Sequence, residues 1–194
     1  MGWEICHFNS RGESISLIFS ETKLKGAFVI DVEKQEDDRG FFARSWDEKN
    51  FEILGLSTKI VQCNISFNNQ KGTLRGLHYQ ASPYEEVKII RCTRGKIFDV
   101  IVDLRVESKT FKEWYGVELS EDNHKMIYVP KGFGHGFQTL ENNTELFYQM
   151  SEFYKSDQAR GVRWNDPVLK INWPLESSII SKKDLSLPLL EDSF

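Results

Sequence analysis

The sequence predicts an all-β fold, and three observations lead to this class. Apolar and polar residues alternate with a period of two in short runs, which is the pattern of half-buried β-strands. Gly, Asn, Asp and Pro interrupt these runs at close intervals, as in β-sandwiches and barrels. The spacing of glycines and histidines from Gly72 to His135 is that of a double-stranded β-helix. We therefore expect a cupin-type jelly roll with a short helix and a C-terminal tail, in a single domain over residues 1–194.

The expected elements begin with an N-terminal extension of strands over residues 1–20, because an Asn-Ser-Arg-Gly turn there predicts a hairpin. A short helix is expected at residues 47–54, where apolar residues lie three apart and a glycine follows. Residues 175–194 are expected to form the tail, with Ser181 and Asp184 as turn or cap residues. Further strands are expected at 14–19, 26–32, 60–66, 74–80, 87–93, 96–105, 114–119, 125–129, 135–140 and 144–150.

The strand at residues 96–105 shows the most regular alternation. Its Phe and Val side chains share one face, whereas Asp99 and Asp103 lie among isoleucines on the other face. Carboxylates among apolar neighbours predict that this second face looks into a polar cavity.

Composition and charge exclude several classes of partner. The chain has 25 Lys and Arg residues against 29 Asp and Glu, a net charge of −4, so it has no general attraction for nucleic acid or anionic membranes. Any phosphate must be bound by a local cluster of cations. Cys6, Cys63 and Cys92 cannot all pair, and we find neither a CxxC motif nor a charged leader followed by an apolar run. We expect a cytoplasmic protein without a nucleic-acid or membrane partner.

The β-helix motif lacks half of the ligands of a metal site. His78 occupies the position of the first histidine, but Gln80 stands where the second histidine belongs and Lys88 where a glutamate belongs. His135 supplies the later histidine. Two imidazoles, an amide and an ammonium form a poor and partly repulsive cage for a divalent cation. The sequence therefore predicts a pocket that works without a metal or another cofactor.

Each histidine also has a plain structural interpretation. Alternation places His78 and Gln80 on one face of their strand, where a histidine is often a hydrogen-bonded polar residue without a catalytic role. His135 could be a core histidine held by Asp99 as well as a ligand contact. Tyr148, beside a phenylalanine, is by itself more often a packing residue. The cupin spacing of the two histidines favours the functional interpretation of both.

The cations raise a question of geometry. Lys88 lies at a strand start, where it is either a solvated edge residue or an inward cation that an anion must meet. Arg39, Arg75 and Lys88 could together hold a diphosphate. Strict alternation, however, points Arg75 away from His78. If Arg75 belongs to the site, a strand irregularity or a second subunit must bring it there.

Ordered segments covering most of the chain, from about Asp31 to Asp184, match one family pattern. They are Asp38–Phe42, Gln62–Asn64, Leu74–Gln80, Lys88, Phe98–Arg105, Pro130–Phe137, Phe147–Gln149, Arg163–Pro167 and Ile171–Pro174. These segments resemble the nucleotide-sugar 3,5-epimerases of 4-keto-6-deoxyhexoses, best known for dTDP-4-dehydrorhamnose 3,5-epimerase. The resemblance implies a metal-free cupin that binds a nucleotide sugar and forms a homodimer, often by exchange of N-terminal strands.

The resemblance also implies roles for individual residues. His78 corresponds to the general base, Asp184 to the carboxylate that orients it, and Tyr148 to the proton donor on the opposite face, with Lys88 and His135 near the sugar. Substrate contacts are implied for Arg39, Gln62, Asn64, Arg75 and Lys183. The chemistry is reasonable, because a C4 ketone acidifies the C–H bonds at C3 and C5. A base can then form an enolate, and an acid can return the proton to the other face at C3, C5 or both.

Two positions depart from the family pattern. Arg44 and Ala159 stand where the pattern has acidic residues. If position 44 lies at the nucleobase, Arg44 exchanges an acceptor for a donor, and a CDP-linked sugar becomes an alternative to a dTDP-linked one. The implied setting is deoxysugar supply for a surface polysaccharide such as the O-antigen of lipopolysaccharide. A metal-dependent cupin oxygenase and a non-catalytic nucleotide-sugar binding protein remain as alternatives.

Overall fold

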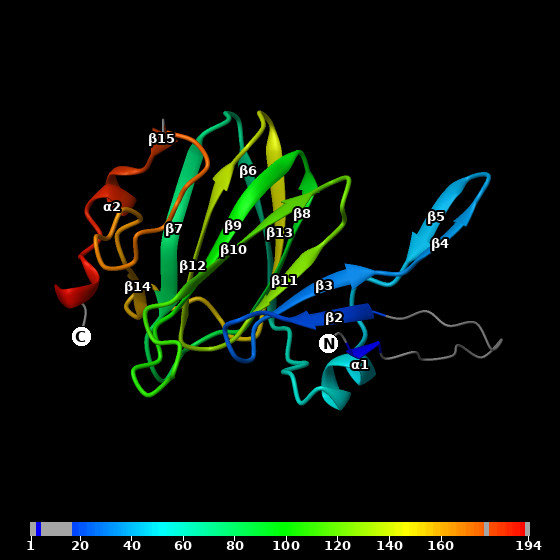
Figure 1. Cartoon of the computed structure of the whole chain (residues 1–194), viewed down its shortest axis with the longest axis horizontal. Helices are drawn as coiled ribbons and strands as arrows, with labels where there is room; N and C mark the ends of the chain where they lie inside the picture. The colour runs from blue at the N-terminus through cyan, green and yellow to red at the C-terminus, as the bar shows by residue number, and fades with distance from the viewer. Residues whose placement is uncertain (1–2, 5–16, 177–178, 193–194) are drawn as a thin grey trace.

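Two antiparallel sheets face each other and form the body of the molecule (Figure 1). The structure, a computed structural model, describes residues 3–4, 17–176 and 179–192. The first sheet has the strand order β1-β2-β3-β11-β8-β13-β6. Its strands are β1 (Trp3–Glu4), β2 (Leu17–Glu21), β3 (Phe28–Val32), β6 (Gln62–Asn68), β8 (Lys88–Arg94), β11 (Met126–Val129) and β13 (Thr144–Met150).

The second sheet has the order β10-β9-β12-β7-β14, and β15 adds to β7 in parallel. Its strands are β7 (Thr73–Gln80), β9 (Lys96–Asp103), β10 (Trp114–Ser120), β12 (Phe133–Thr139), β14 (Ala159–Gly161) and β15 (Ile179–Ile180). The all-β jelly-roll prediction is confirmed, and most expected strands lie within two or three residues of their observed bounds. The expected helix is α1 (Glu48–Ile53), capped by the Asp47 side chain.

A two-stranded hairpin projects from the body (Figure 1). It consists of β4 (Lys34–Asp37) and β5 (Gly40–Ala43) and is absent from the sequence prediction. The four residues of β4 are all polar, and Phe41 and Phe42 of β5 are adjacent, so the hairpin lacks the apolar–polar alternation that predicts a strand.

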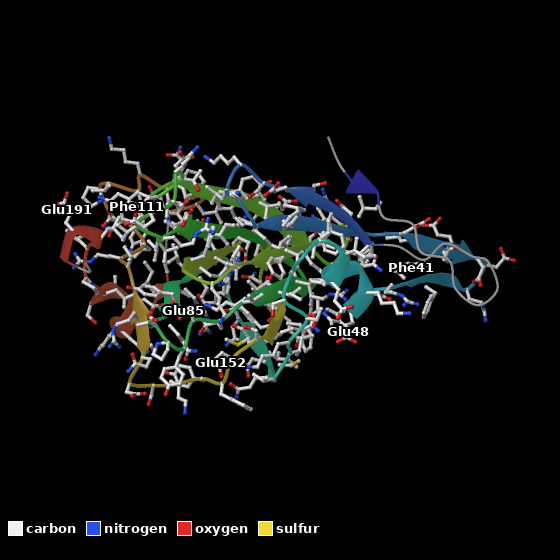
Figure 2. All side chains as sticks on the ribbon, turned by 90° about the horizontal axis from the view of Figure 1, so that it is seen from below. Phe41, Glu48, Glu85, Phe111, Glu152 and Glu191 are labelled. Carbon is white, nitrogen blue, oxygen red and sulfur yellow. The ribbon has the colours of Figure 1, made fainter. Side chains whose placement is uncertain are left out.

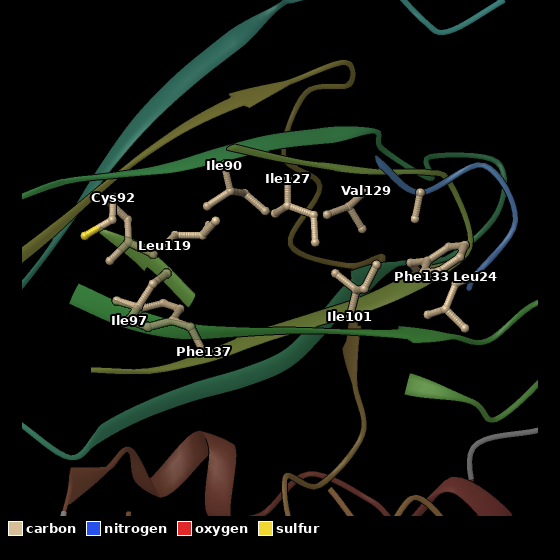
Figure 3. Packing of buried hydrophobic residues seen from close by; sticks show 12 residues of the cluster. Leu24, Ile90, Cys92, Ile97, Ile101, Leu119, Ile127, Val129, Phe133 and Phe137 are labelled. Atoms are coloured by element: carbon tan, nitrogen blue, oxygen red, sulfur yellow. The ribbon is translucent and has the colours of Figure 1, made fainter. Parts of the chain in front are cut away.

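The core fills the space between the two sheets. Figure 3 shows Ile90, Ile127 and Val129 of the first sheet facing Ile97 and Ile101 of the second. All five are almost completely buried, as is expected for β-branched residues on inward strand faces. This core holds the two sheets close enough for side chains of both sheets to meet between them.

The predicted polar cavity at this face of β9 is not found, because no β9 residue lines the cavity and Ile97 and Ile101 pack in the core. Asp99 does reach a pocket residue, as described below. Asp103 does not, because its carboxylate accepts hydrogen bonds from the Arg105 guanidinium and from the hydroxyls of Ser108 (2.6 Å) and Thr110 (2.7 Å). It holds the loop after β9 in place and has no part in the cavity.

The C-terminal segment lies against the second sheet. β15 pairs with the start of β7, and α2 (Lys182–Leu185) follows it. Ser181 caps α2 by accepting a hydrogen bond from the Asp184 amide at 3.0 Å, which confirms the predicted cap. At the N-terminus β1 pairs with β2, whereas the predicted turn lies outside the described residues. No helix in the described part of the chain is long and apolar enough to cross a membrane.

Candidate active site

A cavity of about 310 Å³ lies between the two sheets, near the C-terminal segment. His78 and Arg75 of β7 and His135 of β12 come from one sheet, and Tyr148 of β13 and Lys88 of β8 come from the other. The remaining lining residues are Asn64, Ile65, Ser66, Tyr79, Gln80, Glu86, Phe137, Met150, Tyr154, Ala159, Arg160, Lys183 and Leu187. A cavity of this size, into which polar and charged side chains of both sheets converge, suits a small polar ligand.

His78 and Asp184 form a hydrogen-bonded pair. The Nε2 atom of His78 lies 2.8 Å from Oδ1 of Asp184, and the Gly76 amide donates to Oδ2 at 3.3 Å. Burial acts to raise the pKa of Asp184, but the hydrogen bond and charge of His78 and the Gly76 amide lower it more, so the net pKa lies below its ordinary value. The carboxylate is ionised and fixes one nitrogen of the His78 ring, which leaves Nδ1 for other chemistry.

An irregularity in β7 explains why Arg75 and His78 line the same pocket. β12 pairs His135 with His78 but Phe137 with Arg75, so two β7 residues lie opposite Gly136 alone. Such a bulge adds one residue and reverses the alternation of side chains beyond it. Gly76 stands in the bulge with a φ of +112°, where a Cβ would lie 2.5 Å from Gly136 Cα. The irregularity that the sequence required is therefore present within one subunit.

Lys88 is a buried cation with one partner in the loop before β8 and one in β7 of the other sheet. Its Nζ atom lies 2.9 Å from Oε1 of Glu86 and donates to the backbone oxygen of His78 at 3.2 Å. The anion that meets Lys88 is thus Glu86, which the sequence interpretation did not consider. Lys88 is not the solvated edge residue of the plain alternative.

His135 is held by Asp99 in a second pair of the same kind. The distance from Nε2 to Oδ2 is 2.8 Å, and both side chains are buried. The ring of Tyr148 meets that of His135 edge to face, with centroids 5.9 Å apart. Burial raises the pKa of Tyr148, and the charge of Asp99 raises it further, against a smaller opposite effect of Arg75. The phenol is therefore protonated at neutral pH and can serve as a proton donor.

The residues at the cupin metal positions do not fit a metal ion. The side chain of Gln80 donates to the Tyr84 and Phe153 carbonyls and accepts from the Lys155 amide at 2.6 Å, so it joins two loops at the pocket mouth. Lys88 adds a positive charge. Within the described ranges, His, Cys, Asp and Glu side chains form no group of three that could hold a metal.

The remaining predicted substrate contacts divide into two groups. Asn64 and Lys183 line the pocket, as do Arg75 and His135. Arg39, Arg44 and Gln62 are not among its lining residues, so the structure does not place them in the pocket of their own chain. Arg39 lies at the hairpin tip beside Asp37, Arg44 pairs with Asp47, and the Gln62 side chain accepts a hydrogen bond from the Tyr154 amide at 2.6 Å.

The sequence reasoning missed several polar pocket residues, among them Glu86, Tyr79, Tyr154 and Arg160. Tyr154 lies in a loop, where alternation carries no information about direction. Arg160 lies in the short strand β14, which the sequence did not predict. Tyr79 is the neighbour of His78 in β7, and the alternation of a strand faces it away from His78. For Glu86 a signal existed, since a carboxylate two residues before a strand lysine can pair with it.

Comparison with known proteins identifies close relatives over most of the chain. The family model of dTDP-4-dehydrorhamnose 3,5-epimerase matches residues 21–192. The enzyme of that name from Shigella flexneri is 40% identical over 167 residues, which cover 86% of this chain and 92% of the relative.

Two solved structures of enzymes with this name are also similar. The one from Elizabethkingia anophelis is 40% identical with a TM-score of 0.88 and covers 91% of this chain and 97% of its own. The one from Bacillus anthracis, with TDP and PPi bound, is 46% identical with a TM-score of 0.87 and covers 90% and 99%. The relatives give no support to the oxygenase or binding-protein alternatives. The chain belongs to the dTDP-4-dehydrorhamnose 3,5-epimerase family.

Proposed function

We propose that this epimerase inverts C3 and C5 of a dTDP-linked 4-keto-6-deoxyhexose by proton abstraction and reprotonation. One observation carries the proposal: His78, which is paired with Asp184 of α2, and Tyr148 come from opposite sheets and line the same cavity. A sugar ring between them would meet a base on one face and an acid on the other. Removal of a proton from one face and its return to the other inverts a carbon.

In the proposed mechanism His78 is the general base. Asp184 holds Nε2, so Nδ1 is the nitrogen that takes the proton from the carbon beside the ketone. The ionised carboxylate stabilises the imidazolium that forms, at a distance of 2.8 Å. Since Asp184 is buried, its charge is screened less by solvent than that of a surface pair.

Lys88 is proposed to stabilise the enolate oxygen. Its ammonium already has two partners, Glu86 and the His78 carbonyl, which hold it close to the base. A positioned cation in a buried site favours the negative charge that develops at the C4 oxygen. Tyr148 then delivers its proton to the opposite face of the ring. Asn64, Arg75, His135 and Lys183 are proposed to contact the sugar and the diphosphate.

We propose that the protein is a homodimer in which the β4–β5 hairpin reaches the partner. Phe41 and Phe42 of the hairpin are 47% and 64% exposed. The edge strand β6 exposes Ile65 and Phe67 by 66% and 44%. Apolar side chains on a projecting hairpin and on an unpaired sheet edge favour association. The hairpin would then bring Arg39 to a partner's pocket, which explains why it lies far from its own.

The dTDP carrier is favoured over the CDP carrier. The premise of the CDP hypothesis was that Arg44 lies at the nucleobase, but in its own chain Arg44 pairs with Asp47. The related structure from Bacillus anthracis holds TDP. The proposed setting is the cytoplasm, where the product would supply deoxysugar for a surface polysaccharide such as the O-antigen of lipopolysaccharide.

Proton NMR in D₂O tests the proposed function. The purified protein is incubated with dTDP-4-keto-6-deoxyglucose and, in parallel, with its CDP counterpart. We expect deuterium at both C3 and C5 with the dTDP sugar and much slower exchange with the CDP sugar. Exchange at only one carbon would mean that the enzyme inverts that carbon alone. Faster exchange with the CDP sugar would refute the proposed dTDP carrier. No exchange with either sugar would refute the proposed function.

A further inference from the structure

Glu86 has a carboxylate oxygen that the proposed mechanism leaves unused. The Glu86 side chain lines the cavity and is 3% exposed. Its Oε1 atom pairs with Lys88 at 2.9 Å, whereas Oε2 is buried and accepts no hydrogen bond from any residue that the structure describes. A buried carboxylate oxygen without a donor is costly and rare in folded proteins. A donor that arrives with the substrate would remove this cost.

Lys88 complements that free acceptor with a donor. An ammonium has three N–H groups. Lys88 forms an ion pair with Glu86 Oε1 at 2.9 Å and donates to the His78 carbonyl at 3.2 Å, which leaves at least one N–H group for a ligand. Glu86 and Lys88 therefore present one strong acceptor and one strong donor side by side on the same wall of the cavity.

The substrate class of the proposed function carries the complementary pair on adjacent carbons. The ketone oxygen at C4 is an acceptor, and the hydroxyl at C3 is a donor next to it. C5, the other neighbour of the ketone, bears a methyl group and offers no donor. Resting on the proposed function, we infer that Glu86 accepts a hydrogen bond from the C3 hydroxyl while Lys88 donates to the C4 oxygen, so that Glu86 reads the substituent beside the ketone.

This assignment makes Glu86 a specificity-determining residue. With a sugar that lacks the C3 hydroxyl, Oε2 would stay buried and unpaired, so the pocket should reject that sugar. A hydrogen bond to a charged group corresponds to a preference of about 10- to 100-fold in kcat/KM for the hydroxylated sugar. The hydroxyl is read whether the proton leaves from C3 or from C5.

Two substrates and three proteins test the inference. The substrates are dTDP-4-keto-6-deoxyglucose and its 3-deoxy counterpart, and the readout is kcat/KM for deuterium incorporation at C5, followed by proton NMR in D₂O. The proteins are the wild type, Glu86→Gln and the control Glu85→Gln. Glu85 is the neighbouring residue, labelled in Figure 2, and does not line the cavity. Both variants remove one negative charge from the same loop.

The test is decided by the substrate preference, which is the ratio of kcat/KM for the two sugars. In Glu86→Gln the amide oxygen stays with Lys88, so an NH₂ group replaces Oε2, and at best a neutral hydrogen bond remains. We expect the preference to fall by about tenfold in Glu86→Gln and to be unchanged in Glu85→Gln. Any intrinsic effect of the hydroxyl on C5 acidity is common to all three proteins and cancels.

Three outcomes overturn the inference. If wild type processes both sugars equally, Glu86 does not read the hydroxyl, and no variant is needed to see this. If Glu86→Gln slows both sugars alike and keeps the preference, Glu86 only supports Lys88, and the proposed function stands. If wild type exchanges neither sugar at C3 or C5, the proposed function fails and this inference fails with it.

Discussion

Replacement of Asp184 with asparagine removes the negative charge next to His78 and keeps the size of the side chain. Asp184 Oδ1 lies 2.8 Å from Nε2 of His78. Two unit charges about 4 Å apart attract by about 1 kcal/mol in water and about 4 kcal/mol at the effective dielectric of a protein surface. The His78 side chain is 43% exposed and that of Asp184 5%, which places the pair between these limits.

A loss of about 2 to 3 kcal/mol of imidazolium stabilisation slows proton abstraction by about 30- to 150-fold. The asparagine amide can also donate to Nε2, which would place the proton on Nδ1 and block the base. We therefore expect the rate of deuterium incorporation in D₂O to fall by at least that factor, while the affinity for dTDP changes little.

Asp99→Asn is the matched control for this experiment. The His135–Asp99 pair has the same 2.8 Å distance and is more deeply buried, but His135 is not the proposed base. Replacement of Asp99 with asparagine should slow deuterium incorporation much less than Asp184→Asn does. The assignment of His78 would be refuted if Asp184→Asn exchanged at the wild-type rate, or if Asp99→Asn alone abolished exchange.

Three further predictions concern the acid, the bulge and a buried carboxylate. Tyr148→Phe should slow net inversion more than solvent exchange, because abstraction does not need the phenol; equal slowing in NMR would contradict this. At Gly76, φ is +112° and an added Cβ would lie 2.5 Å from Gly136 Cα. Gly76→Ala should therefore lower the free energy of unfolding by at least about 2 kcal/mol and the Tm in calorimetry by about 4 to 8 °C. An unchanged Tm would argue against the bulge. For Asp103, burial acts to raise the pKa, but hydrogen bonds led by that from Arg105 lower it below the ordinary 3.8. The ionised carboxylate therefore stabilises the fold above pH 3.8, and this stabilisation is lost as the pH falls further. Asp103→Asn should lower the free energy of unfolding by about 3 kcal/mol at pH 7 and by less below pH 3.8. The same loss at both pH values would refute the assigned ion pair.

The sequence predicted the strands well where one face is buried. Alternation depends only on local spacing, so β7, β8, β9 and β13 are found within one or two residues of their bounds. The same rule found nothing in the β4–β5 hairpin. Local spacing needs contrast between two faces, and the hairpin has none.

For the site, the order of residues in the chain named candidate side chains but not which of them meet in space. The motif spacing named His78 and His135 and showed that the metal ligands are incomplete. Asp184 could be named only by resemblance, because it lies 106 residues from His78 in the chain and meets it through packing of the C-terminal segment. The link from Tyr148 to the site depends likewise on the distance between two sheets.

The sequence by itself determined the fold class, the family and the types of side chain available for chemistry, because these depend on composition, order and local period. Only the tertiary structure decided which of those side chains meet. The bulge at Gly76 reverses alternation and brings Arg75 to the face of His78, and Glu86 turns out to be the partner of Lys88. Such outcomes depend on register and on contacts between distant strands, and a period read along one chain contains no information about either.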